Sequence, residues 1–342
     1  MPGSIVNPAR LPPRARDSVC EQCHLSGEAR IPNPGKQLSD FRPDQNLEEV
    51  YSVYVSGVSP DPLRPKALKV ISQAQQLALS TCARQSHGNL WCGTCHDPHE
   101  QPADPQQYFR SRCLSCHGTA LLTSHPRPNA DCVACHMPRR PATDGAHTVF
   151  TDHRIARRPP AEPGTPGNDR PSALVAWYAP PAALQQRNLG LAEVEVGERS
   201  KSFQMVFQGH QRLVACLPEF PNDPAVLTSI GQVLLGAGRG IDAATVFERV
   251  IRIEPDVASN YLHEGLAWKT AHNNQKAIKY LEKALERDPL LEQPYRELAK
   301  TYSEAGNNAM VRVTMDRYRR AFPKSLEAKT AAVGETGPSS FH

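Results

Sequence analysis

The sequence predicts a mainly α-helical protein, with a loop-rich first half followed by an α-solenoid. Three observations predict this fold class. Four C-x-x-C-H pentapeptides lie in the first half, and the last of them ends at His136. Proline is concentrated before residue 183, with 24 of the 32 prolines. A sequence period of about 34 residues then begins near position 190. The length of 342 residues is sufficient for two domains.

The C-x-x-C-H spacing is the attachment signature of c-type haem. Two thiols can add to the two vinyl groups of one porphyrin, and the following histidine then lies under the iron as its proximal ligand. We therefore expect four haem c groups, each with one iron. Structural zinc and thiol redox chemistry are the alternatives for such cysteines. The expected thioether cysteines are Cys20, Cys23, Cys92, Cys95, Cys113, Cys116, Cys132 and Cys135, and the expected proximal ligands are His24, His96, His117 and His136.

The second axial position of each iron decides between a carrier and an enzyme. Outside the pentapeptides, the first half holds five histidines. His99 follows His96 so closely that we expect it to reach a neighbouring haem. The expected distal ligands are His99, His125, His147 and His153, with His87 as the weaker candidate.

The second half carries prolines at a regular spacing of about 34 residues, which is the length of a tetratricopeptide repeat. Small residues recur at one register position and large ones at another, for example Gly231 with Phe247 and Gly265 with Leu281. Each unit is expected to be a helix-turn-helix, and stacked units form a concave surface that receives a protein or peptide. The predicted repeats are 190–223, 224–257, 258–291 and 292–325.

These features divide the chain into four parts. We expect a tetrahaem cytochrome c domain over residues 1–156, a proline-rich linker over 157–186, repeats over 187–325 and a flexible tail over 326–342. Within the first part, helices are expected around 46–55, 66–79 and 106–114.

Charge and location follow from the same motifs. The formal charge of +4 falls to about neutral with four ferric haems, so the composition gives no case for nucleic-acid binding.

Haem of this type is attached outside the cytoplasmic membrane, and we expect a periplasmic or extracellular protein. The chain starts without an export signal, and we expect that signal to lie in a missing N-terminus. No stretch has the length and apolar character of a membrane span.

The chain resembles multihaem c-type cytochromes of bacterial periplasmic respiration that are fused to tetratricopeptide repeats. The resemblance rests on Cys92–His99 (CGTCHDPH), Cys132–Pro138 (CVACHMP) and His147–His153 (HTVFTDH). Similar forms recur among relatives of the tetrahaem cytochrome of ammonia oxidation and of pentahaem nitrite reductase. The resemblance implies closely stacked bis-histidine haems, and no C-x-x-C-K motif is present.

The expected function is electron transfer between redox partner proteins, with the repeats docking a partner and no catalytic residue. The alternative is an oxidoreductase that acts on a small nitrogen or sulfur oxyanion at an open haem. An anion-attracting rim for that alternative would be Arg139, Arg140, Arg154, Arg157 and Arg158.

Overall fold

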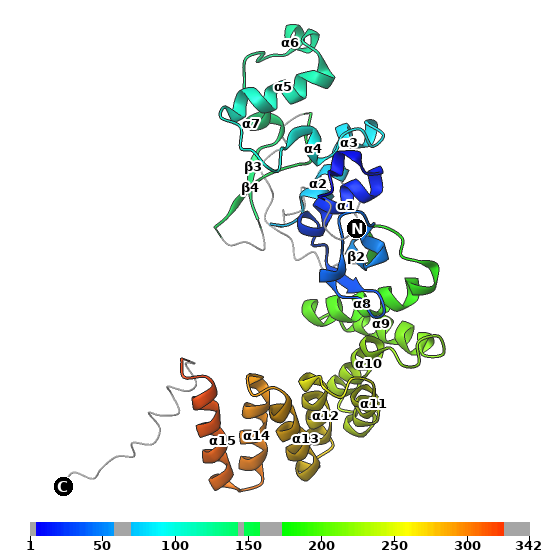
Figure 1. Ribbon diagram of the computed structural model, residues 1–342, viewed down its shortest axis with the longest axis vertical. Helices are drawn as coiled ribbons and strands as arrows, with labels where there is room; N and C mark the ends of the chain where they lie inside the picture. Colours follow the sequence, from blue (N-terminus) through cyan, green and yellow to red (C-terminus); the bar gives the residue numbers. More distant parts are fainter. Residues whose placement is uncertain (1–4, 58–69, 143–146, 158–172, 325–342) are drawn as a thin grey trace, which may run out of the picture. The chain divides into compact units, whose positions relative to one another are not determined.

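The structure, a computed structural model, describes residues 5–57, 70–142, 147–157 and 173–324 (Figure 1). The chain divides into two compact units, Met1–Ala192 and Glu193–His342. Half of the predicted linker (158–172) and all of the predicted tail lie outside the described residues.

The first unit contains a small antiparallel sheet that the sequence analysis did not predict. Its strands are β1 (Ala29–Pro32), β2 (Tyr51–Ser56) and β5 (Leu174–Ala176), in the order β1-β2-β5. The helix expected over 46–55 is wrong, because a 3-10 turn, η3 (Leu47–Glu49), leads directly into β2. The first five residues of β2 are all buried, so tertiary burial decides the conformation of this segment.

Helix α1 (Pro13–His24) is tied to this sheet region by a buried acidic side chain. Glu21 accepts hydrogen bonds from Trp177 Nε1 at 2.9 Å and from the Tyr178 hydroxyl at 2.8 Å. Burial raises the pKa of Glu21. The apolar core beside it is formed by Leu25, Phe41, Leu47, Val50, Tyr51, Val53 and Val55. The first C-x-x-C-H motif, at the end of α1, is therefore carried by a packed scaffold.

The other three C-x-x-C-H motifs lie on helices that bury no side chain. The elements are α2 (Gln73–Leu79), α3 (Thr81–Gln85), α4 (Cys92–Cys95), α5 (Pro105–His117), α6 (Ala120–Ser124), α7 (Cys132–His136) and a hairpin of β3 (Arg139–Pro141) with β4 (Val149–Thr151). Helices α4 and α7 both contact α5. None of the residues of α4 to α7, all of which are described, is buried. These helices have little protein core to stabilise them.

The second unit is built from helix pairs. The helices are α8 (Gln185–Ser200, which begins in the first unit), α9 (Phe203–Cys216), α10 (Pro224–Gly236), α11 (Gly240–Ile253), α12 (Ala258–Thr270), α13 (Asn274–Arg287), α14 (Glu292–Glu304) and α15 (Asn308–Ala321). The first helices of successive repeats begin at 224, 258 and 292, and the second helices begin at 240, 274 and 308. A regular repeat of about 34 residues is that of a tetratricopeptide-repeat solenoid.

Packing inside each repeat follows the predicted register. A Cβ at Gly231 would lie 2.6 Å from the Phe247 ring, and a Cβ at Gly265 would lie 2.7 Å from Leu281 Cγ. Glycine is therefore required where the two helices of a repeat approach most closely. Tyr261 and Leu281 are buried, as expected for the seam between helices. Short 3-10 turns, η1 (Pro8–Arg10), η2 (Leu38–Asp40) and η4 (Ala182–Leu184), complete the described elements.

Candidate functional site

The four C-x-x-C-H motifs share one local geometry. In each motif the two cysteines are three positions apart at a helical turn, so their thiols project from one face. All ten cysteines of the chain lie in the described part, and each is a free thiol. Cys23 and Cys116 are exposed and the other six motif cysteines are half-buried. The thiols of the four motifs are therefore accessible to a large planar group.

Thiols of different motifs also lie close together. The thiols of Cys20 and Cys92 interact, which lowers the pKa of Cys20 and raises that of Cys92. Burial, with a smaller contribution from a hydrogen bond to Cys132, raises the pKa of Cys113 to about 11. The first motif thus lies beside the second, although a long stretch of sequence, from His24 to Cys92, separates them.

Two proximal histidines face two of the predicted distal ones. The ring centres of His96 and His153 are 6.1 Å apart, and those of His125 and His136 are 6.0 Å apart. Nδ1 of His136 lies 2.8 Å from the carbonyl oxygen of Ala156, and Nδ1 of His153 lies 2.9 Å from that of Thr151. Such a contact fixes Nδ1 as the donor and leaves Nε2 free to bind a metal.

The remaining candidates are exposed, as His96 is. His24 and His117 end α1 and α5 with exposed side chains, and Nδ1 of His24 lies 3.3 Å from the Gln73 side-chain oxygen. His99, His147 and His87 are also exposed. For these three, the structure shows no ring contact with a proximal histidine of the described part.

A buried carboxylate that the sequence analysis missed positions His153. Arg154 hydrogen-bonds both oxygens of Asp152, and Arg140 Nε lies 3.3 Å from Asp152 Oδ2. Burial alone would raise the pKa of Asp152, but the hydrogen bonds and charge of Arg154, with the charge of Arg140, lower it overall. Gln76 Oε1 accepts the His153 backbone N–H at 2.8 Å. Only the structure shows these contacts, since Gln76 and His153 are far apart in the sequence.

The proposed arginine rim does not form as expected. Arg140 is buried, and both Arg140 and Arg154 form an ion pair with Asp152. Arg158 lies outside the described residues. Arg140 and Arg154 hold the hairpin end in place, and they do not form an open surface for an anion.

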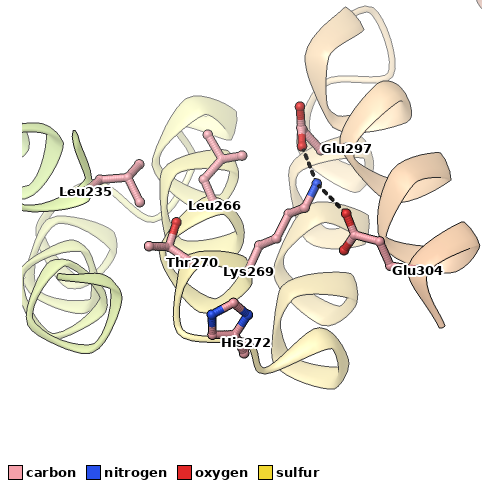
Figure 2. Close-up of a pocket in the computed structure, with 7 residues that line it drawn as sticks. All are labelled: Leu235, Leu266, Lys269, Thr270, His272, Glu297 and Glu304. Carbon is pink, nitrogen blue, oxygen red and sulfur yellow. Dashed lines mark hydrogen bonds and ion pairs between the residues drawn. The ribbon is translucent and has the colours of Figure 1, made fainter. Parts of the chain in front are cut away.

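The repeat unit holds a second candidate site, a pocket of about 510 Å³ (Figure 2). It is lined by Leu235, Leu266, Lys269, Thr270, His272, Glu297 and Glu304. Except for His272, these residues come from α10, α12 and α14, the first helices of three successive repeats. Lys269 Nζ lies 2.8 Å from Glu297 and 3.7 Å from Glu304 (Figure 2). None of these residues was predicted as a site, because the repeat period identifies the positions that pack between helices and gives no signal for the positions that line the groove.

Comparisons with solved structures identify repeat proteins. The chain is similar to MamA (residues 41 to the end) from Desulfovibrio magneticus RS-1, with 18% identity over 43% of this chain and 76% of that chain and a TM-score of 0.35. It is also similar to TTC0263, a thermophilic TPR protein from Thermus thermophilus, with 16% identity over 42% of this chain and 79% of that chain and a TM-score of 0.36. No family model matches the chain, and no curated protein matches it significantly. The helix bounds and their regular spacing carry the repeat assignment.

These findings correct the function expected from the sequence. The similar structures are MamA and TPR proteins, and none of those named here is an electron-transfer protein. In the described ranges, no group of three or more His, Cys, Asp or Glu side chains is placed to hold a metal ion. The expectation of respiratory electron transfer, with its oxyanion-reductase alternative, is therefore wrong. Among the helices that the structure describes, none has the length and apolar character needed to cross a membrane.

Proposed function

We propose that the protein docks an extended segment of a partner protein on its repeats, at the pocket around Lys269. The observation that carries this proposal is the position of the pocket on the first helices of three successive repeats. Stacked repeats use extended surfaces of this kind for binding.

The chemistry of the lining indicates the type of segment. Leu235 and Leu266 offer an apolar surface, and the lining also carries the carboxylates of Glu297 and Glu304. The Glu297 side chain is 15% exposed and is paired with Lys269 at 2.8 Å and with Lys300 at 3.2 Å. The Glu304 side chain is 54% exposed, and its contact with Lys269 is longer, at 3.7 Å. Glu304 is therefore the group best able to accept a new ion pair. We infer a segment with an aliphatic side chain next to a lysine or arginine.

A displayed library of linear peptides, panned against the full chain, tests this proposal. Enriched peptides should combine an aliphatic and a basic residue. The Kd of one enriched peptide, measured by calorimetry, should rise about tenfold in Glu304→Lys, since that change replaces an attraction by a repulsion. Glu286→Lys is the matched control, because Glu286 is an exposed residue of α13 outside the pocket. Equal weakening by both variants, or enrichment of acidic peptides, would contradict the proposal.

We also propose that the four C-x-x-C-H motifs hold covalent haem c and that the protein is periplasmic or extracellular. The free thiols, their spacing and the adjacent histidines support this cofactor. A bound haem supplies an iron with four porphyrin nitrogens and two axial positions for side chains. Intact mass of chain exported in a host that attaches haem should show four increments of about 616 Da each. A mass without these increments would exclude the cofactor and leave the docking proposal standing.

A further inference from the structure

The pair formed by His96 and His153 has the spacing of two ligands on one metal. An imidazole nitrogen binds a metal at about 2.0–2.1 Å and lies roughly 1.1 Å from its ring centre, so two imidazoles on opposite sides of one metal have ring centres about 6.3 Å apart. The observed separation is 6.1 Å, and the angle between the two ring planes is 31°.

We propose that His96 and His153 are the two axial ligands of a single haem iron, the one attached at Cys92 and Cys95. This inference rests on the proposed cofactor. It requires only two protein ligands, because the porphyrin supplies the other four. It goes beyond the docking function and gives one of the distal candidates a defined partner.

The surroundings of His153 hold its ring in position. Asp152 precedes it with a side chain that is 4% exposed and paired with Arg140 and Arg154. The backbone N–H of His153 donates to Gln76, which is buried. Nδ1 of His153 lies beside the Thr151 carbonyl, so Nε2 keeps its lone pair for the metal. The ring of Phe109 makes a T-shaped contact with that of His96, with ring centres 5.6 Å apart.

The second ring pair has the same spacing but a different hydrogen-bond pattern. Nδ1 of His125 accepts a hydrogen bond from the Arg127 amide at 3.1 Å, which in a neutral ring leaves the proton on Nε2. Metal binding through Nε2 of His125 would have to break that bond. We therefore restrict the assignment to His96 and His153.

The test uses the full chain with haem attached and electron paramagnetic resonance of the ferric protein. His153→Ala should add one high-spin ferric haem per chain relative to the unsubstituted protein, and added imidazole should remove that signal. His210→Ala is the matched control, because His210 lies in α9 of the repeat unit and is none of the ligand candidates. This control should leave the spin state of every haem unchanged.

His153→Met keeps a ligand in place if the alanine variant does not fold. A thioether in place of imidazole should raise the reduction potential of one haem in a redox titration. The assignment is overturned if the spin state and potentials are unchanged in the His153 variants, or if His210→Ala produces the change expected of His153→Ala. A mass without haem would overturn the assignment together with the cofactor proposal, whereas full haem loading with an unchanged spin state would overturn the assignment alone.

Discussion

Glu264 is a buried acid in α12 whose environment favours its protonated form. One oxygen accepts a hydrogen bond from Trp268 Nε1 at 2.6 Å, and the other has no hydrogen-bond partner among the described residues. Burial raises the pKa of Glu264 to about 7, and the charge of Glu248 acts in the same direction. Lys276 lies over the Trp268 ring, 3.6 Å from its centre, and partly opposes the shift.

This raised pKa predicts a stability that depends on pH. Between the usual pKa of 4.5 and about 7, the folded state binds more protons than the unfolded state, so the free energy of unfolding falls as pH rises through this window. Glu264→Gln keeps the shape and cannot ionise. We expect the variant to be more stable than the unsubstituted protein at pH 8 by roughly 1–3 kcal/mol, with a smaller difference at pH 4.5. Urea unfolding followed by far-ultraviolet circular dichroism at both pH values measures this, and a pH-independent difference would contradict it.

The junction between successive repeats depends on a glycine at the start of α11. A Cβ at Gly240 would lie 2.6 Å from the Ala267 carbonyl oxygen and 2.6 Å from the Ala271 nitrogen. Both are backbone atoms at the end of α12, and backbone cannot move aside as a flexible side chain can. This contact joins the second helix of one repeat to the first helix of the next.

A pair of alanine substitutions separates this packing effect from helix propensity. Gly240→Ala should lower the free energy of unfolding by roughly 1–3 kcal/mol, because the added methyl group overpacks the junction. Gly236→Ala is the matched control, since a Cβ there meets nothing within 4 Å. It should be neutral or stabilising by up to about 1 kcal/mol. The same urea titration measures both variants, and a loss of stability in Gly236→Ala equal to that in Gly240→Ala would rule out the packing explanation.

At the scale of the whole chain, the two units are stabilised in different ways. Repeat helices bury continuous apolar seams, such as Tyr261, Leu281 and Tyr295 with Leu298. In the first unit, the sheet and α1 have their own core, whereas α4 to α7 bury no side chain. The first unit therefore combines a self-supporting part with one that has little protein core of its own.

The range of the interactions explains what the sequence could and could not predict. The repeats were predictable because each helix pair is local and its small and large positions recur in every repeat, as at Gly265 and Leu281. The sheet was not, since β5 joins β2 from a distant part of the sequence and all three strands are short. For the candidate haem site, spacing identified the histidines. The contact between His96 and His153 joins two distant parts of the sequence and follows only from the fold.

The lack of buried side chains in α4 to α7, together with the proposed haem, leads to a prediction for the whole molecule. Helices as short as these are marginal in water unless an apolar surface covers them. Three porphyrins, one attached at each of the motifs that begin with Cys92, Cys113 and Cys132, would supply that surface. We expect chain made without haem attachment to show weak hydrogen-exchange protection in α4 to α7, and haem-loaded chain to show strong protection there.

Helices α10 to α14 should be equally protected in both preparations, because their core is formed by protein side chains alone. Strong protection of α5 in the haem-free chain would show that this helix is stable without the cofactor, whereas a loss of protection in α12 would show that haem stabilises the repeats as well.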